Sequence, residues 1–86
     1  MPNDLSHRTS RKLSPGSHDP LGATLGPGGV NFSLYSATAE EVWLFFFDRP
    51  DGDPTDIIRV QDRDRFAWHV FVHGAGAGQL YGYKVR

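Results

Sequence analysis

From Val30 to the end of the chain, short apolar runs alternate with turn-forming residues, and in several of these runs the apolar positions recur at every second residue. The first run covers residues 30–35. In this run an apolar set alternates with a second, more polar set: Val30, Phe32 and Leu34 with Asn31, Ser33 and Tyr35. A period of two places the first set on the core face of a β-strand and the second set toward solvent. Because no run keeps the three-four apolar spacing of a helix, the pattern predicts an all-β sandwich.

The next run, residues 42–47, is apolar at every position, so we expect a strand that is covered on both sides. If its even-numbered residues point to the core, Trp43, Phe45 and Phe47 form an outward aromatic stripe. Such a stripe is larger than a monomeric sheet normally leaves exposed. It therefore requires a partner, either another protein layer or a sugar.

The second half of the chain predicts three more strands separated by polar or glycine-rich turns. A short strand covers residues 57–60, and residues 61–65 form a charged hairpin connection. In the following strand one face carries the apolar set Phe66, Trp68, Val70 and Val72, and the other carries Ala67, His69, Phe71 and His73. In the last strand Tyr81, Tyr83 and Val85 share one face, and that strand is still running at Arg86.

Length and composition limit the class of protein. A chain of 86 residues suffices for one small domain, whereas a barrel enzyme needs roughly 250 residues. The chain has no cysteine, which excludes disulfides and thiolate metal sites. There is neither a signal-peptide pattern nor an apolar run near the roughly 20 residues of a membrane span. We expect a soluble, cytoplasmic domain without a membrane partner.

Residues 1–17 are polar and modestly basic, with Arg8, Arg11 and Lys12 against Asp4. Clustered cations can contact nucleic acid, but here no aromatic residues are interleaved with them. The composition favours a disordered, solvated lead-in without a nucleic-acid partner. We therefore divide the chain into a lead-in over residues 1–17 and a sandwich over residues 18–86.

Three groups of residues suggest catalytic or metal chemistry, but none meets its requirements. The glycines at 74, 76 and 78 precede a strand, not the helix that a phosphate loop requires, and so indicate a turn. His69 and His73 would lie roughly 13 Å apart on a strand, too far to share a metal ion. The aspartates at 48, 51, 53 and 56 stand beside proline and glycine, as turn formers do. The sequence thus predicts no catalytic residue, no metal site and no cofactor.

Carbohydrate binding requires exposed aromatic faces for the apolar side of a sugar ring, with polar groups nearby for its hydroxyls. The candidate residues are Trp43, Tyr35, Phe45 and Phe47. Tyr83 and Trp68 are two further aromatic candidates, and Trp68 stands among core-facing residues and is expected to be a packing anchor. For the outward stripe we favour packing against a second layer or another domain over sugar stacking.

Several short segments, in order, resemble one family of modules: Pro20–Thr24, Gly29–Ser36, Trp68–His69 and Gly78–Tyr83. The resemblance is to the N-terminal carbohydrate-binding module of family 48 in glycogen-debranching enzymes of the isoamylase type, within the α-amylase superfamily. It covers about residues 16 to 86. It implies an immunoglobulin-like antiparallel β-sandwich that is itself not an enzyme.

The resemblance also implies the role of the module. The parent protein would be a glycoside hydrolase that cleaves α-1,6-glucosidic branches and continues beyond Arg86. The module would pack against the catalytic barrel of the same polypeptide and could contact an α-glucan such as glycogen, starch or a malto-oligosaccharide. Residues 47–52 lack the loop tryptophan and asparagines of glycogen-binding members, which favours the packing role. Two alternatives stay open: an autonomous α-glucan-binding module and a generic β-sandwich interaction domain.

Overall fold

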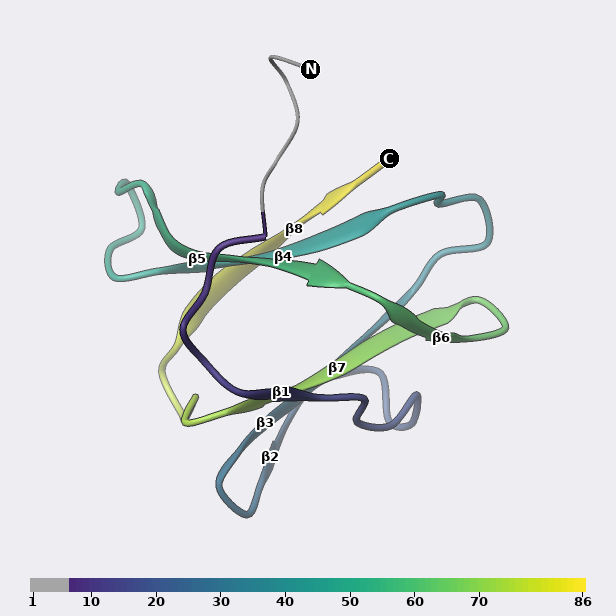
Figure 1. Ribbon diagram of the computed structural model, residues 1–86, viewed down its shortest axis with the longest axis horizontal. Coiled ribbons are helices and arrows are strands. Elements are labelled where there is room, and N and C mark those ends of the chain that lie inside the picture. The colour runs from purple at the N-terminus through teal and green to yellow at the C-terminus, as the bar shows by residue number, and fades with distance from the viewer. Residues whose placement is uncertain (1–6) are drawn as a thin grey trace.

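The computed structural model describes residues 7–86, and within that range the chain consists of strands and connecting turns without a helix (Figure 1). The eight strands are β1 Leu13–Ser14, β2 Gly22–Gly26, β3 Gly29–Tyr35, β4 Val42–Phe47, β5 Pro54–Val60, β6 Asp62–Asp64, β7 Ala67–His73 and β8 Leu80–Val85. One sheet has the order β1-β7-β3-β2, with β6 also paired to β7, and the other has the order β5-β4-β8. Each pairing is antiparallel, so the predicted all-β sandwich is confirmed.

The core lies between the two sheets, as the alternation predicts. The buried apolar residues include Val30 and Phe32 of β3, the even-numbered residues of β4, and Trp68, Val70 and Val72 of β7. Phe32 and Phe46 meet across the two sheets with their ring centroids 5.5 Å apart. Strands β3 and β7 are paired along their whole length, from Gly29 opposite His73 to Tyr35 opposite Ala67. Strands β3 and β7 therefore supply most of the core residues that come from the larger sheet.

The prediction of a disordered lead-in is wrong for much of residues 7–17, because this segment pairs with strand edges of both sheets. The backbone of Arg8 exchanges two hydrogen bonds with Ile57 of β5, at 2.6 and 2.8 Å. Leu13–Ser14 then pairs with Phe71 and Val72 of β7. The segment satisfies backbone groups that an edge strand would otherwise leave unpaired, and this requires no apolar pattern of its own. Residues 1–6 lie outside the described residues.

Asn31 and Ser33, which we expected to face solvent, are buried with only 9% and 3% of their surface exposed. The following part of the same N-terminal segment covers them. The Asn31 side chain accepts a hydrogen bond from the Ser17 backbone N–H (2.8 Å) and donates one to the Ser17 carbonyl (2.9 Å). Ser33 Oγ donates to the His18 carbonyl at 2.8 Å. These polar residues point outward from the sheet, as the alternation requires, and bind the chain that crosses it.

Two further expectations from the sequence are corrected by the structure. Phe66 is not on the core face but in the turn before β7, with 46% of its surface exposed, because the strand starts one residue later. Asp56 lies within β5 and not in a turn; it is buried and accepts a hydrogen bond from Thr9 Oγ1 at 2.6 Å. The glycine turn after β7 is confirmed, since Gly74 and Gly78 both adopt positive φ angles there.

The two long sides of the sandwich differ. On one side the chain crosses between the sheets twice, once from Arg8 to Leu13 and once from Val60 of β5 to Asp62 of β6. On the other side the edge strands β2 and β8 leave a cleft of about 210 Å³, whose lining includes Ala23, Leu25 and Tyr81. Two crossing segments thus close one side, whereas on the other side the connection from β7 to β8 lines the cleft with residues 76–79. Residues 7–86 contain no helix that is long and apolar enough to cross a membrane.

Candidate functional site

The outward stripe of β4 lies on the outer face of the smaller sheet. Phe45 and Phe47 are half-buried, and their rings meet edge to face with centroids 6.3 Å apart. Gly82 of β8 lies directly opposite Phe45, and a Cβ added to this glycine would come within 3.8 Å of the Phe47 ring. The missing side chain on β8 therefore leaves the two phenylalanine rings without a neighbour at that position.

Trp43 belongs to the same face but is largely covered, with 7% of its surface exposed. It pairs with Arg59 of β5, whose guanidinium carbon lies 5.7 Å from the centre of the indole ring. Glu41 Oε2 accepts from that guanidinium at 3.4 Å and helps to hold it in place. A sugar that stacked on Trp43 would have to displace Arg59.

Tyr35, the fourth candidate, lies in the other sheet at the end of β3. It is 58% exposed and meets Phe66 edge to face at 6.0 Å. The structure therefore brings together Trp43, Phe45 and Phe47 but separates Tyr35 from them. Sequence reasoning missed Phe66 as its partner, although the charged residues before it indicated a turn.

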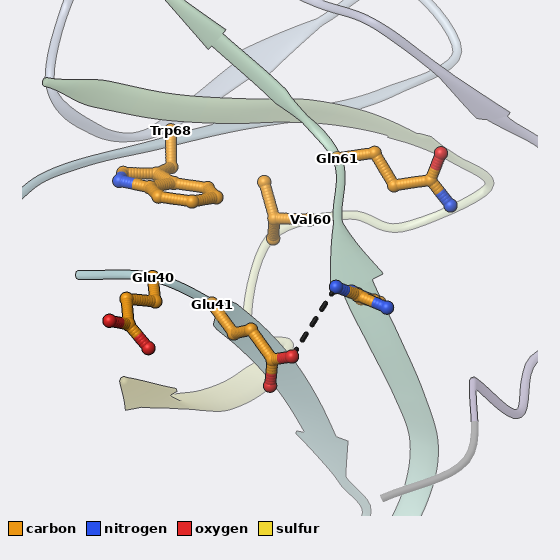
Figure 2. A pocket seen from close by; sticks show the side chains of 6 residues that line it. Glu40, Glu41, Val60, Gln61 and Trp68 are labelled. Atoms are coloured by element: carbon orange, nitrogen blue, oxygen red, sulfur yellow. Dashed lines mark hydrogen bonds and ion pairs between the residues drawn. The ribbon is translucent and has the colours of Figure 1, made fainter. Parts of the chain in front are cut away.

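A second concave site lies where the chain leaves β5 and enters β6 (Figure 2). It has a volume of about 380 Å³ and is lined by Glu40, Glu41, Arg59, Val60, Gln61 and Trp68. In Figure 2 the indole of Trp68 lies above the two glutamates, with its nitrogen at the end of the ring on the Glu40 side. Trp68 is buried in the core, as expected for a packing anchor. Glu40 and Gln61 were not recognised from the sequence, because neither stands in an apolar pattern.

Tyr83 points inward and packs against the core, so it is not an exposed sugar platform. Its hydroxyl is buried without a hydrogen-bond partner among residues 7–86. Burial, together with the nearby Tyr81 hydroxyl, raises the pKa of Tyr83 to about 12. This phenol therefore stays neutral well above neutral pH. Residues 7–86 contain no group of three or more side chains placed to hold a metal ion.

These features define a small antiparallel sandwich whose candidate surfaces are an aromatic strip and a polar pocket. The chain belongs to the family described as carbohydrate-binding module 48 (isoamylase N-terminal domain), which matches over residues 20–86.

Relatives of this chain are much longer proteins. A glycogen debranching enzyme of Serratia proteamaculans is 40% identical over 75 residues, which is 87% of this chain and 11% of that enzyme. A glycogen operon protein GlgX homolog of Mycobacterium tuberculosis is 41% identical over 72 residues, or 84% of this chain and 10% of that protein. The chain thus spans about a tenth of the length of these relatives.

Among solved structures, the chain resembles a pullulanase of Paenibacillus barengoltzii in complex with maltohexaose and α-cyclodextrin. The TM-score is 0.73 at 26% sequence identity, and the match covers 84% of this chain and 11% of the pullulanase. The sandwich described above is therefore also found as a small part of a much larger enzyme.

Proposed function

We propose that this chain is the non-catalytic accessory module of a glycogen-debranching glycoside hydrolase that cleaves α-1,6-glucosidic branches. The observation that carries the proposal is a sequence match to a glycogen debranching enzyme. The match is 40% identical and covers most of this chain but only about a tenth of that enzyme. An 86-residue sandwich is too small to include a catalytic barrel of roughly 250 residues. The reaction would therefore belong to another part of the parent protein.

The module's own partners are, on this proposal, the catalytic barrel of the same polypeptide and an α-glucan. The half-buried Phe45 and Phe47 beside Gly82 supply apolar surface that suits either a packed domain or the apolar face of a sugar. The covered ring of Trp43 favours the packed domain, since its indole face is already occupied by Arg59. A cytoplasmic location stays a prediction.

An exchange of modules tests the proposal. The matched residues of the Serratia proteamaculans enzyme are replaced by this chain, and the release of linear chains from glycogen is measured against the parent enzyme and a deletion of the module. We expect the exchanged enzyme to fold and to keep most of its activity, and the deletion to lose it. An exchanged enzyme that is stable but no more active than the deletion would contradict the proposal.

A titration separates glucan contact from packing. Labelled chain is titrated with maltoheptaose while the backbone amides of β4 are followed by NMR, with Phe45→Ala as the binding variant and Tyr35→Ala as its exposed aromatic control. Saturable shifts on β4 that Phe45→Ala removes would assign a sugar-binding role to this face. Signals on β4 that do not move at millimolar sugar would leave domain packing as its role.

A further inference from the structure

Strand β8 is an open edge of the sandwich (Figure 1, yellow). It ends the sheet order β5-β4-β8, so only one of its two sides is paired. The outer side of β5 is bonded to Arg8 at Ile57, and β1 and β6 both pair with the outer side of β7. Among residues 7–86, β8 is therefore the longest strand that has one side free of backbone hydrogen bonds. Free N–H and C=O groups on such an edge can pair with a strand of another chain.

The pairing of β8 with β4 determines which of its backbone groups are free. Arg86 N donates to the Glu41 carbonyl at 2.9 Å, and the Arg86 carbonyl accepts from Glu41 N at 3.1 Å. Along an antiparallel pair, residues bonded in this way alternate with residues whose backbone groups point away from the partner strand. The even-numbered residues of β8 are therefore bonded to β4. The N–H and C=O groups of Tyr81, Tyr83 and Val85 point to the open side.

The side chains of β8 alternate with the same period. On the inner face Tyr81 and Val85 stay 42% and 47% exposed although both are apolar or aromatic. On the outer face Gly82 leaves a gap beside the Phe47 ring, and Lys84 is exposed two residues further on. The edge thus combines two uncovered apolar side chains, one gap beside an aromatic ring, and one cation.

A second β8, antiparallel to the first, matches the free backbone groups when a two-fold axis passes beside Tyr83. Tyr83 then faces Tyr83 of the second copy, and Tyr81 and Val85 of each copy face one another. Each of these three facing pairs exchanges two hydrogen bonds, which makes six. A register shifted by two residues in either direction keeps only two such pairs within β8. The backbone therefore favours this register.

The same register matches the side chains. Tyr81 faces Val85 of the second copy, so the two exposed apolar side chains cover each other. Gly82 faces Lys84 of the second copy, whose aliphatic stem fills the gap beside Phe47 while its ammonium lies against the aromatic ring. A lysine on an edge strand usually opposes pairing, because an incoming strand would bury its charge. Opposite a glycine on the outer face, this charge stays at the surface of the sheet.

We propose that two copies of this chain associate through β8, with Gly82 of each copy facing Lys84 of the other. The two three-stranded sheets then form one continuous sheet. Because the same surface is used on both copies, the contact closes at a dimer. An interface of one strand per copy is at the small end of specific interfaces, so we expect a dissociation constant of roughly 10–100 µM. The proposal does not depend on the accessory-module function, since it uses only β4 and β8.

Cysteine pairs test the register, because the chain has no cysteine of its own. Gly82→Cys and Lys84→Cys chains are mixed at about 200 µM, oxidised and separated by mass. Facing residues of a non-hydrogen-bonded pair have Cα atoms about 4.5 Å apart, which a disulfide spans, whereas like cysteines would lie diagonally at about 7–8 Å. We expect the disulfide between unlike chains to exceed each disulfide between like chains about tenfold.

Sedimentation of the cysteine-free chain tests the association itself. The mass should rise from 9.6 kDa toward twice that value between about 1 µM and 1 mM. Gly82→Thr should weaken the dimer about tenfold, because it fills the gap for the lysine. Its own fold should be kept, since a Cβ at Gly82 meets only the Phe47 ring, at 3.8 Å, and a thermal melt at low concentration checks this. Gly76→Ala, in an open turn, is the matched control and should leave the dimer unchanged.

Three outcomes would overturn the proposal. The mass stays at 9.6 kDa up to 1 mM, or the like and unlike disulfides form equally. The third outcome is a dimer that Gly82→Thr leaves intact and Leu25→Asp abolishes, which would assign the contact to β2. A monomeric chain that still supports debranching after the module exchange would contradict this proposal alone, so the two proposals fail separately.

Discussion

The two hydrogen bonds between Asn31 and Ser17 make a quantitative prediction about how the N-terminal segment is held. Asn31→Ala removes an acceptor for the Ser17 N–H (2.8 Å) and a donor for its carbonyl (2.9 Å). A hydrogen bond of this kind contributes about 0.5–1.5 kcal/mol net, so we expect the free energy of unfolding to fall by about 2 kcal/mol. For a domain of this size that lowers Tm by about 10 °C.

The measurement is urea unfolding followed by tryptophan fluorescence, together with hydrogen exchange of the Ser17 amide. Ser33→Ala is the matched control on the same strand face; it removes one bond, to the His18 carbonyl, and should cost about 1 kcal/mol. Asn31→Asp keeps the acceptor but sets a carboxylate against the Ser17 carbonyl, so this variant should also be less stable at neutral pH. Part of the lost stability should return at low pH, when the carboxyl is protonated and can donate to the carbonyl.

The reasoning about Asn31 would be refuted by one combination of results. In that combination, Asn31→Ala lowers the free energy of unfolding by less than about 0.5 kcal/mol, as a typical surface substitution does. In addition, the Ser17 amide keeps its protection against hydrogen exchange.

Two further predictions concern Tyr83 and the glycine that begins β3. The pKa of Tyr83 is raised from 10.0 to about 12, so the unfolded chain loses this proton first and stability should fall as pH rises between those values. Tyr83→Phe should remove that part of the alkaline loss, measured in thermal melts between about pH 10 and pH 12. It should not lower stability at neutral pH, because the hydroxyl has no hydrogen-bond partner among residues 7–86. A less stable variant at neutral pH would show that the hydroxyl has a partner. A Cβ at Gly29 would collide with the Val72 carbonyl oxygen, so Gly29→Ala should lower the free energy of unfolding by about 3 kcal/mol or more. Gly76 has open space around it, so Gly76→Ala should change that free energy by less than about 0.5 kcal/mol in the same urea assay. Equal stability of the two glycine variants would contradict the close approach of β3 and β7.

The sequence predicted the sandwich because burial imposes a period of two, and Val30, Phe32, Val70 and Val72 are buried as that period requires. The same rule placed Asn31 on the outer face correctly but could not show what covers that face. The covering segment is held by backbone pairing and by polar side chains, so it carries no hydrophobic periodicity. Its composition therefore indicated disorder, although Arg8 and Leu13–Ser14 are paired with strands of both sheets.

The candidate sites were predicted less completely than the fold. The stripe of Trp43, Phe45 and Phe47 could be predicted from alternation within one strand. The separation of Tyr35 from that stripe depends on which strand joins which sheet, and this is a property of the topology. The pocket beside Trp68 depends on the crossing at Gln61, where residues distant in sequence come together. A pattern within single strands contains no information about such a crossing.

The crossings on one long side of the sandwich also determine how the domain can open without unfolding. The segment from Arg8 to Leu13 and the passage from β5 to β6 each connect one sheet to the other, so they hold the two sheets together along this side. On the opposite side β8 is joined to β7 by a connection that lines the cleft, whereas β2 pairs only with β3, and both edges bear exposed apolar residues such as Leu25 and Tyr81. Transient opening should therefore widen the β2–β8 gap first, and amide exchange should spread inward from those strands toward β7 and β4.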